Sequence, residues 1–263
     1  MRLRFLAAAA AILAFLTIVV ALPASAATRP RIQWQAKICR MDELWRTRDL
    51  LGEQVIIRND FWSPAHVCVQ TAGRFATAWR VTSSSGLRHG FIGAFPDEFY
   101  GCSYGKCTKD ARLPAMWTSV PRVAVTWITE PGLPSGTVNK ALDIWLSVHR
   151  HVGGQAKGAE IMVWLAASYT PPYGRLPIVR VGGVRYFFGH HRACDVLGCW
   201  NYILFRRVYP VSAIHGLLLA PFFRFAASHH LASRAWFLEG VEAGAEIGWI
   251  HGSLTTDEFY VRP

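Results

Sequence analysis

The stretch Ala159-Glu160-Ile161-Met162-Val163-Trp164-Leu165 has the alternation and composition of a β-strand. It is rich in β-branched, aromatic and long apolar residues and contains neither Gly nor Pro. Side chains alternate across a strand, so Glu160, Met162 and Trp164 share one face and the aliphatic residues share the other. We expect the aliphatic face to enter a core and the face of Glu160 to line a cleft. A buried carboxylate is costly unless it has a partner or a function.

A second acidic stretch reads Val241-Glu242-Ala243-Gly244-Ala245-Glu246-Ile247-Gly248-Trp249. Its alternation places Glu242 and Glu246 on one face. A third predicted strand, 141–148, carries Asp143 and Trp145 on one face. Because two acidic strands supply two carboxyls, we predict a pair of catalytic acids, with Glu242 and Glu246 as rival candidates for the second. The competing interpretation is a hydrogen-bonded structural carboxylate.

Short strand-like runs continue through the chain between Gly, Pro, Ser and Asn residues. They are 54–58, 78–82, 123–128, 141–148, 159–166, 178–181, 184–188, 202–208, 236–246 and 258–261. Many short, regularly spaced strands predict an all-β sandwich or barrel. Apolar residues recur at helical spacing only in 214–232, which predicts one helix packed outside the sheets. No Pro-, Ser- or Gly-rich linker divides the chain, so a single domain is expected.

Residues 1–26 have the features of a secretory signal peptide. Two arginines precede an apolar run over 5–21, and Ala24-Ser25-Ala26 has the small-x-small form of a cleavage site. The alternative is an uncleaved membrane anchor, because about 17 apolar residues just span a bilayer. Pro23 and the small residues after it favour cleavage. We therefore expect a secreted, extracellular chain of residues 27–263 that has no membrane contact after cleavage.

The six cysteines predict disulfides, as is usual in an exported chain. Two close pairs each enclose a short turn that contains Gly, so local bridges fit them and the remaining two cysteines are left to pair. The expected bridges are Cys39–Cys68, Cys102–Cys107 and Cys194–Cys199. A zinc site is the alternative, but neither close pair has the two-residue spacing typical of such sites.

The chain is basic, with 28 Lys and Arg against 17 Asp and Glu and a formal net charge of +11. The arginines are scattered and Lys is rare, which argues against a nucleic-acid-binding face. Histidines occur in close pairs, but no acidic partner stands at ligand spacing and no His-Glu-x-x-His motif is present. We expect a monomer that uses no metal and no cofactor.

Cleavage of a glycosidic bond needs two carboxyl groups. One protonates the leaving oxygen, and the other attacks the sugar carbon or activates water. Sugar rings also stack on exposed aromatic side chains, and the chain has 11 Trp, 8 Tyr and 15 Phe. Core packing accounts for most of these rings. Paired glutamates together with many aromatics favour a carbohydrate-cleaving site.

The motifs, taken in order, resemble glycoside hydrolase family 12, the retaining endo-β-1,4-glucanases and xyloglucanases. The likeness runs from about Cys39 to Val261 and departs from the family at Asp60, where Asn is usual, and at Ala245. The matching pieces are Asn59-Asp-Phe-Trp62, Trp79-x-Val81, Phe95-Pro96, Tyr100-Gly101-Cys102, Cys107-Thr108, Ser135-Gly136 to Asp143-Ile144-Trp145, Glu160-Ile-Met-Val-Trp164 and Val241-Glu-Ala-Gly-Ala-Glu246-Ile.

The resemblance implies a two-sheet β-jelly roll with a concave substrate cleft. It implies that Glu160 is the nucleophile and Glu246 the general acid/base, whose pKa the charge of Glu160 raises. Asp143 then orients Glu160 through a hydrogen bond. The family's disulfides also match the first two bridges expected from spacing.

Five further positions receive roles from the same resemblance. It assigns Met162 and Trp164 to the reaction centre, Asn59 and Trp62 to a sugar on the non-reducing side, and Glu242 to the cleft lining. The function implied is a retaining endo-β-1,4-glucanase that cleaves β-glucan by double displacement. The alternative is a non-catalytic carbohydrate-binding jelly roll, which needs the aromatics but not both glutamates.

Overall fold

Strands dominate the chain. The structure, a computed structural model, describes residues 32–263 except 63, 74–75, 87–90, 110, 151–152, 172–174 and 197. Within these residues it contains eighteen strands and one helix. The strands form two sheets, so the expected all-β, two-sheet jelly-roll class is confirmed.

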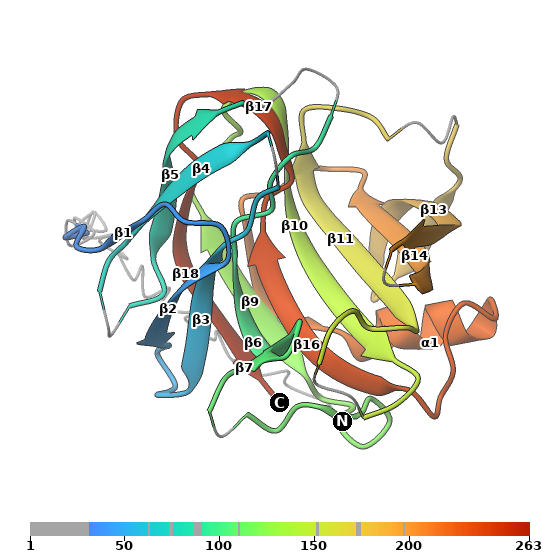
Figure 1. Ribbon diagram of the computed structural model, residues 1–263. Coiled ribbons are helices and arrows are strands. Elements are labelled where there is room, and N and C mark those ends of the chain that lie inside the picture. Colours follow the sequence, from blue (N-terminus) through green and yellow to red (C-terminus); the bar gives the residue numbers. More distant parts are fainter. Residues whose placement is uncertain are drawn as a thin grey trace, which may run out of the picture. The chain divides into compact units, whose positions relative to one another are not determined.

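The smaller sheet has six strands. They are β1 (Lys37–Ile38), β4 (His66–Thr71), β5 (Trp79–Ser85), β9 (Ala124–Thr129), β15 (Ala213–Leu218) and β18 (Thr255–Arg262). Their order across the sheet is β1-β4-β5-β18-β9-β15, and every pair is antiparallel. The C-terminal strand β18 therefore lies in the middle of this sheet (Figure 1).

The larger sheet has twelve strands. They are β2 (Glu43–Arg48), β3 (Gln54–Asn59), β6 (Asp97–Ser103), β7 (Lys106–Cys107), β8 (Ala115–Met116), β10 (Ser135–Ser147), β11 (Ala159–Ala167), β12 (Ile178–Val181), β13 (Val184–Asp195), β14 (Gly198–Arg207), β16 (Phe237–Gly244) and β17 (Ile247–His251). The main order is β12-β13-β14-β11-β10-β16-β6-β3-β2. Among the described strands, β11 and β14 are the one parallel pair.

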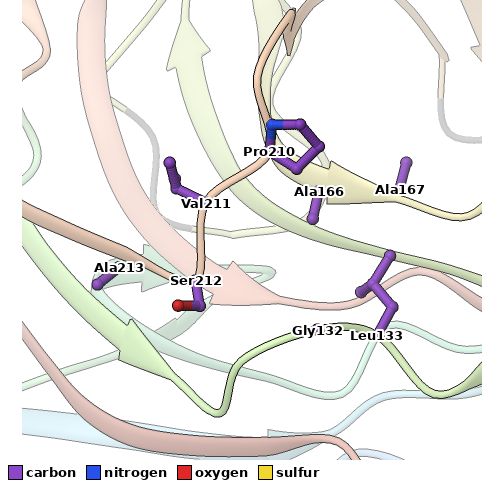
Figure 2. Close-up of a pocket in the computed structure, with 8 residues that line it drawn as sticks. All are labelled: Gly132, Leu133, Ala166, Ala167, Pro210, Val211, Ser212 and Ala213. Atoms are coloured by element: carbon purple, nitrogen blue, oxygen red, sulfur yellow. The ribbon is translucent and has the colours of Figure 1, made fainter.

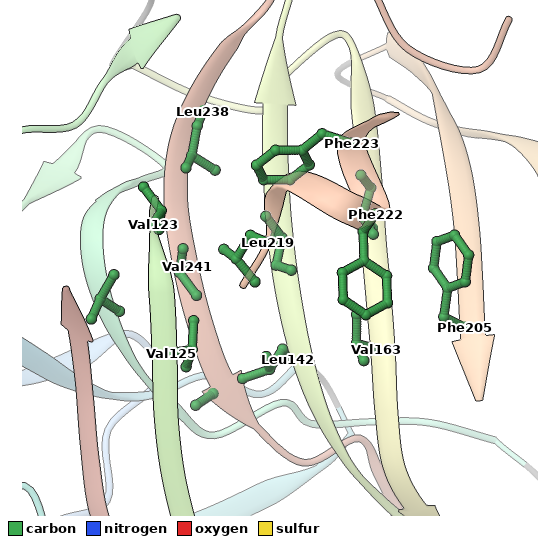
Figure 3. Close-up of a cluster of buried hydrophobic side chains, with 14 of the residues drawn as sticks. Val123, Val125, Leu142, Val163, Phe205, Leu219, Phe222, Phe223, Leu238 and Val241 are labelled. Atoms are coloured by element: carbon green, nitrogen blue, oxygen red, sulfur yellow. The ribbon is translucent and has the colours of Figure 1, made fainter. Parts of the chain in front are cut away.

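The core is built from the facing sides of both sheets. Figure 3 shows side chains of β9, β10, β11, β14 and β16 meeting those of the helix. On β11, Ile161, Val163 and Leu165 are buried in this core, which confirms the alternation read from the sequence. The opposite face of β11 is therefore free to carry a site.

The helix is shorter than the apolar spacing over 214–232 predicts. Residues 213–218 form β15, which pairs with β9 and is interrupted by a bulge where Gly216 has a φ of +60°. Helix α1 spans Ala220–Ser228, with a proline in its first turn. Strand pairing overrides helical periodicity in the first part of the segment, and the proline favours a helix start.

The helix packs into the core at two positions. Phe222 and Phe223 are each 1% exposed and join the same cluster as the strand residues (Figure 3). The helix thus contributes to the core and does not only cover the outside of the sheets.

All three expected disulfides are confirmed. They are Cys39–Cys68, Cys102–Cys107 and Cys194–Cys199. The two short-range bridges join neighbouring strands, β6 to β7 and β13 to β14, and each closes a hairpin.

The expected signal peptide, residues 1–26, lies outside the described residues. In the part of the chain that is described, no helix is long and apolar enough to cross a membrane.

Candidate active site

A pocket of about 170 Å³ opens on the face of the larger sheet opposite the core. Six of the eight side chains predicted for the site line it: Asp143, Glu160, Glu246, Met162, Trp62 and Glu242. Six further side chains complete the lining: Arg58, Asp60, Phe95, Tyr104, Trp145 and Trp200. Carboxyl groups and aromatic rings therefore converge in one place.

Strand register brings the acidic residues together. Asp143 on β10 is paired with Met162 on β11 and with Glu242 on β16. Two residues further along β10, Trp145 is paired with Glu160. Paired residues on neighbouring strands point to the same face. Three adjacent strands thus place carboxyls that are distant in sequence over one patch of sheet.

Glu246 is held by two polar side chains. Strand β16 ends at Gly244, two residues before the end expected from the sequence, so Glu246 lies between β16 and β17. Its backbone N–H donates to Asn139 Oδ1 at 2.8 Å, and the Asn139 amide donates to its Oε2. The Tyr169 hydroxyl donates to the same oxygen at 2.9 Å. The backbone carbonyl of Glu246 also accepts the Asn139 N–H at 3.2 Å. Together these bonds fix the carboxyl at the pocket.

Glu160 receives a hydrogen bond from an indole. Trp200 Nε1 donates to Glu160 Oε2 at 2.6 Å. Burial raises the pKa of Glu160 to about 8, the charges of Glu246 and Glu242 add to this rise, and the Trp200 bond opposes it. Burial likewise raises the pKa of Glu246, against its bonds from Tyr169 and Asn139. The pKa of Glu246 is thus raised as expected, but burial is the main cause and not the charge of Glu160.

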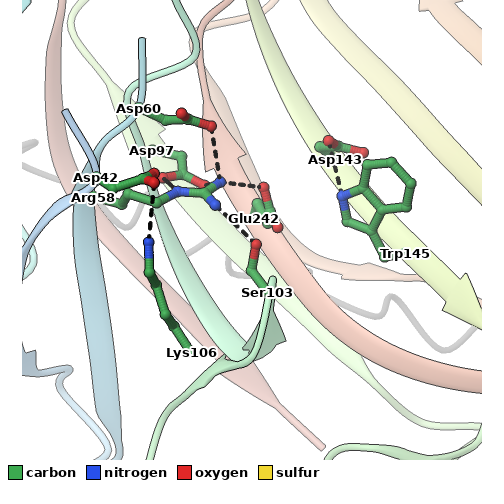
Figure 4. Close-up of polar contacts among 9 residues, drawn as sticks. All are labelled: Asp42, Arg58, Asp60, Asp97, Ser103, Lys106, Asp143, Trp145 and Glu242. Carbon is green, nitrogen blue, oxygen red and sulfur yellow. Dashed lines mark hydrogen bonds and ion pairs between the residues drawn. The ribbon is translucent and has the colours of Figure 1, made fainter. Parts of the chain in front are cut away.

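Asp143 is not hydrogen-bonded to Glu160 as the resemblance implies. Its Oδ2 accepts the Trp145 indole N–H at 3.1 Å (Figure 4). Its Oδ1 is buried and has no hydrogen-bond partner among the described residues. Burial raises its pKa well above the usual range, followed by the charges of Glu160 and Glu242. The protonated form of Asp143 is therefore favoured beside Glu160.

A buried arginine supports the acidic side of the pocket (Figure 4). The Arg58 guanidinium donates to both oxygens of Asp97, at 3.0 and 2.7 Å, and to Glu242 Oε2 at 2.9 Å. It also donates to Ser103 Oγ at 2.9 Å and lies 3.6 Å from Asp60 Oδ2. Glu242 therefore lines the pocket as predicted, but with one oxygen already bound.

Two predicted binding residues lie away from the pocket. Asn59 is fully buried, and its amide donates to the backbone carbonyls of Ile38, Arg40 and Val67. The next residue, Asp60, lines the pocket instead.

Trp164 is also buried, at 2% exposure. Its ring lies 5.1 Å from that of Tyr169, the residue that bonds Glu246. Trp164 is not among the lining residues of the pocket and packs against Tyr169 instead.

Some of the residues that were missed had a visible signal. Arg58 is a lone charge in the otherwise apolar run Val55-Ile56-Ile57, which is the pattern that singled out Glu160. Trp145 shares the predicted face of Asp143. Trp200 had no local signal, because it reaches Glu160 through the parallel pairing of β14 with β11.

A cavity larger than this pocket lies elsewhere among the described residues. It measures about 590 Å³ and is lined by Gly132, Leu133, Ala166, Ala167, Pro210, Val211, Ser212 and Ala213 (Figure 2). None of these side chains is titratable. The carboxyl groups that could carry acid–base chemistry line the smaller pocket instead.

No protein-family model and no curated protein matches the sequence. Solved structures do match. A metagenome-derived glycoside hydrolase family 12 endoglucanase is 27% identical with a TM-score of 0.75, over 86% of this chain and 96% of its own. The endoglucanase Cel12A from Rhodothermus marinus is also 27% identical with a TM-score of 0.75, over 86% of this chain and 98% of its own.

A family 12 xyloglucanase from Bacillus licheniformis shares the fold at 18% identity and a TM-score of 0.74, over 86% of this chain and 99% of its own. The resemblance to glycoside hydrolase family 12 is thereby confirmed in three dimensions over most of the chain.

Proposed function

We propose that this chain, a structural relative of family 12 glycoside hydrolases, is a secreted retaining endo-β-1,4-glucanase that cleaves internal bonds of β-glucan. One observation carries the proposal. Glu160 and Glu246 line the same aromatic pocket, on a fold shared with two endoglucanases at 27% identity. Two carboxyl groups in one pocket are the minimum that glycoside hydrolysis needs.

The reaction proceeds in two steps. Glu160 attacks the anomeric carbon while Glu246 protonates the leaving oxygen, and a covalent glycosyl-enzyme forms. Water then attacks the same carbon while Glu246 accepts its proton. Each step inverts the carbon, so the product keeps the configuration of the substrate. The roles of the two glutamates follow the resemblance to family 12.

The environment of the two glutamates favours the protonated carboxyl that this mechanism needs. One carboxyl must be protonated and the other ionised before attack. Burial raises the pKa of both Glu160 and Glu246, and carboxylates in one buried site do not both ionise readily. We infer that these raised pKa values favour the form of the pair that holds one proton. Once Glu160 is bound to sugar, its charge is gone and Glu246 can act as the base.

Exposed aromatic rings support carbohydrate binding beside the carboxyls. Trp62 is 45% exposed and Tyr104 is 42% exposed, and both line the pocket. Large exposed aromatics present an apolar face for a sugar ring and a polar edge for its hydroxyls. Trp62 is the residue expected to hold a sugar on the non-reducing side.

Two features favour export. Three disulfides are typical of proteins that fold in an oxidising compartment. The sequence of residues 1–26 has the form of a signal peptide.

The alternative is a jelly roll that binds carbohydrate without cleaving it. Binding needs Trp62 and Tyr104 but gives no reason to hold Glu160 and Glu246 at a raised pKa. Burial without a charge partner destabilises carboxylates, so their retention favours an enzyme.

The test is an assay of reducing-end release on cellulose, xyloglucan and mixed-linkage glucan. Wild type is compared with Glu160→Ala, Glu246→Ala and the control Glu258→Ala, which removes a carboxyl from β18 on the smaller sheet. Wild type and the control should release sugar, and the other two should lose about 10³-fold or more. Equal release by all four contradicts the assignment. Polymer binding without release by wild type supports the alternative.

The two roles are separated by azide and an aryl β-cellobioside with a good leaving group. Without Glu160, azide attacks the sugar directly and gives an α-glycosyl azide. Without Glu246, the glycosyl-enzyme still forms and azide opens it to a β-glycosyl azide. The reverse pattern exchanges the roles of the two glutamates.

A further inference from the structure

The hydrogen bond from Trp200 to Glu160 gives a function to a residue outside the motifs that resemble the family. We propose that Trp200 is a positioning residue for the nucleophile: its indole N–H holds Glu160 Oε2 and stabilises the ionised carboxylate, while the other oxygen attacks the sugar. This inference rests on the proposed function. The two atoms lie 2.6 Å apart, which is a short N–H···O hydrogen bond.

Strand register explains how the indole reaches Glu160. β14 runs parallel to β11, with Asn201 beside Ala159 and Tyr202 beside Glu160. Trp200 is two residues before Tyr202, so its side chain points to the same face as that of Glu160.

Both neighbours of Trp200 in the chain are fixed. The preceding residue, Cys199, is bound to Cys194 across the β13–β14 hairpin. The following residue, Asn201, donates its amide to Leu231 O at 2.8 Å and its backbone N–H to Gly158 O at 3.0 Å. The disulfide-closed hairpin therefore presents the indole in a defined position, which is what a positioning residue requires.

The aromatic wall of the pocket fixes the ring itself. The rings of Trp145 and Trp200 lie 5.9 Å apart at 57°, and each indole N–H serves a different carboxyl, Asp143 or Glu160. Asp143 bonds Trp145 and not Glu160, and the indole of Trp200 supplies the hydrogen bond to Glu160 that the resemblance gives to Asp143. Each of the two neighbouring tryptophans thus donates a hydrogen bond to one of the two carboxyls.

The charges around Glu160 all act against its ionisation. Glu246 and Glu242 raise its pKa along with burial, and Glu160 in turn raises that of Asp143 on β10. The Trp200 bond is the interaction that lowers the pKa of Glu160. Without it, the nucleophile is less often ionised and less well aimed.

Trp200→Phe removes the N–H and keeps an aromatic ring. We expect kcat to fall by about 10- to 100-fold, as for loss of a hydrogen bond to a charged group, with a smaller change in KM. The acidic limb of the pH profile of kcat/KM should move to higher pH, because the pKa of Glu160 rises. The control is Trp45→Phe, which also loses an indole hydrogen bond, to Gly73 O at 3.3 Å, away from the pocket. A raised KM with unchanged kcat and acidic limb makes Trp200 a sugar platform and overturns the proposal.

A measurement without catalysis separates this inference from the proposed function. In protein labelled with ¹⁵N-tryptophan, the Trp200 Nε1–H resonance is assigned by its absence in Trp200→Phe. This resonance should move downfield as Glu160 ionises and so follow the titration of that carboxyl. In Glu160→Gln the resonance should persist without that titration. This result can be obtained even if the protein cleaves no glucan. If the enzyme is active but its Trp200 resonance does not titrate with Glu160, the role of Trp200 is contradicted and the proposed function is not. Should Trp200→Phe not fold, pH titration of the wild-type indole resonances against those of Glu160→Gln decides the matter.

Discussion

Asp143 on β10 and Glu242 on β16 are direct cross-strand partners, and their side chains are only 7% and 1% exposed. Like charges in this position destabilise a sheet. Two different devices relieve the repulsion. Burial raises the pKa of Asp143 and so favours its neutral form, and Glu242 is paired with the Arg58 guanidinium at 2.9 Å. The buried Arg58 guanidinium therefore supplies the counter-charge for the acidic side of the pocket.

Arg58→Gln should destabilise the fold at pH 7 by about 3–5 kcal/mol, because it leaves the buried carboxyls of Asp97 and Glu242 without their counter-charge. The loss should be smaller at pH 5, where Asp97, whose pKa burial raises and Arg58 lowers, can take up a proton. Urea unfolding at both pH values measures it. Arg58→Gln combined with Glu242→Gln should recover part of the loss, and the exposed Arg262→Gln should change little. Equal stability of Arg58→Gln and wild type would show that the network contributes nothing.

Glu160→Gln should stabilise the fold while abolishing activity. The pKa of Glu160 is about 8 against an ordinary 4.5, so the folded state binds a proton that the unfolded state has lost. The free energy of unfolding of wild type therefore falls as pH rises from about 4.5 to about 8. The variant lacks the part of this loss that comes from Glu160. Gln also keeps an oxygen to accept the Trp200 bond. Thermal unfolding at pH 5 and pH 8 should show the variant gaining on wild type at pH 8 only. A parallel shift at both pH values would refute the linkage, and Glu258→Gln is the control.

The sheet face that carries Glu160 could be read from the sequence because alternation is a local property. The apolar neighbours of Glu160 on β11 are core residues, as a period of two requires. The same logic failed at 214–232, where β15 precedes the helix. Apolar residues at 214, 217 and 218 fit a helical spacing and a bulged strand equally well, and pairing with β9 decides between them.

Contacts between distant strands could not be read in this way. Trp200 depends on a parallel register with β11, and the Arg58 network joins β3, β6 and β16. Motif order placed Asn59 at the substrate, although the pocket is lined by Asp60. Adjacent strand residues point to opposite faces, so a shift of one residue decides which side chain faces the pocket.

Tyr169→Phe should move the basic limb of the pH profile to higher pH. The Tyr169 hydroxyl donates to Glu246 Oε2 at 2.9 Å and lowers the pKa of this carboxyl against burial. Without the hydroxyl, Glu246 keeps its proton to higher pH, so the general acid stays competent there. The rate at the optimum should fall severalfold, as for one lost hydrogen bond of about 1 kcal/mol. The profile of kcat/KM measures both effects, and the exposed Tyr209→Phe serves as control. A shift of the basic limb to lower pH would contradict the role of Glu246 as acid.

Trp62→Ala should weaken substrate binding more than it slows chemistry. The indole is 45% exposed at the pocket and lies in the segment that resembles the family's sugar-binding motif. Loss of an aromatic platform of this kind raises KM by about tenfold, on an aromatic contact of roughly 0.5–1.5 kcal/mol beyond its area. Stability should change by less than about 0.5 kcal/mol, as at other exposed positions. Trp62→Tyr should restore most of the binding, because a ring face remains.

Steady-state kinetics on cello-oligosaccharides of increasing length give the decisive comparison for Trp62→Ala. The defect should appear only with substrates long enough to extend to the non-reducing side. A loss of kcat that is the same for every length would instead place Trp62 at the reacting bond, and Tyr209→Ala, which removes an exposed ring outside the pocket, controls for a general effect of aromatic surface.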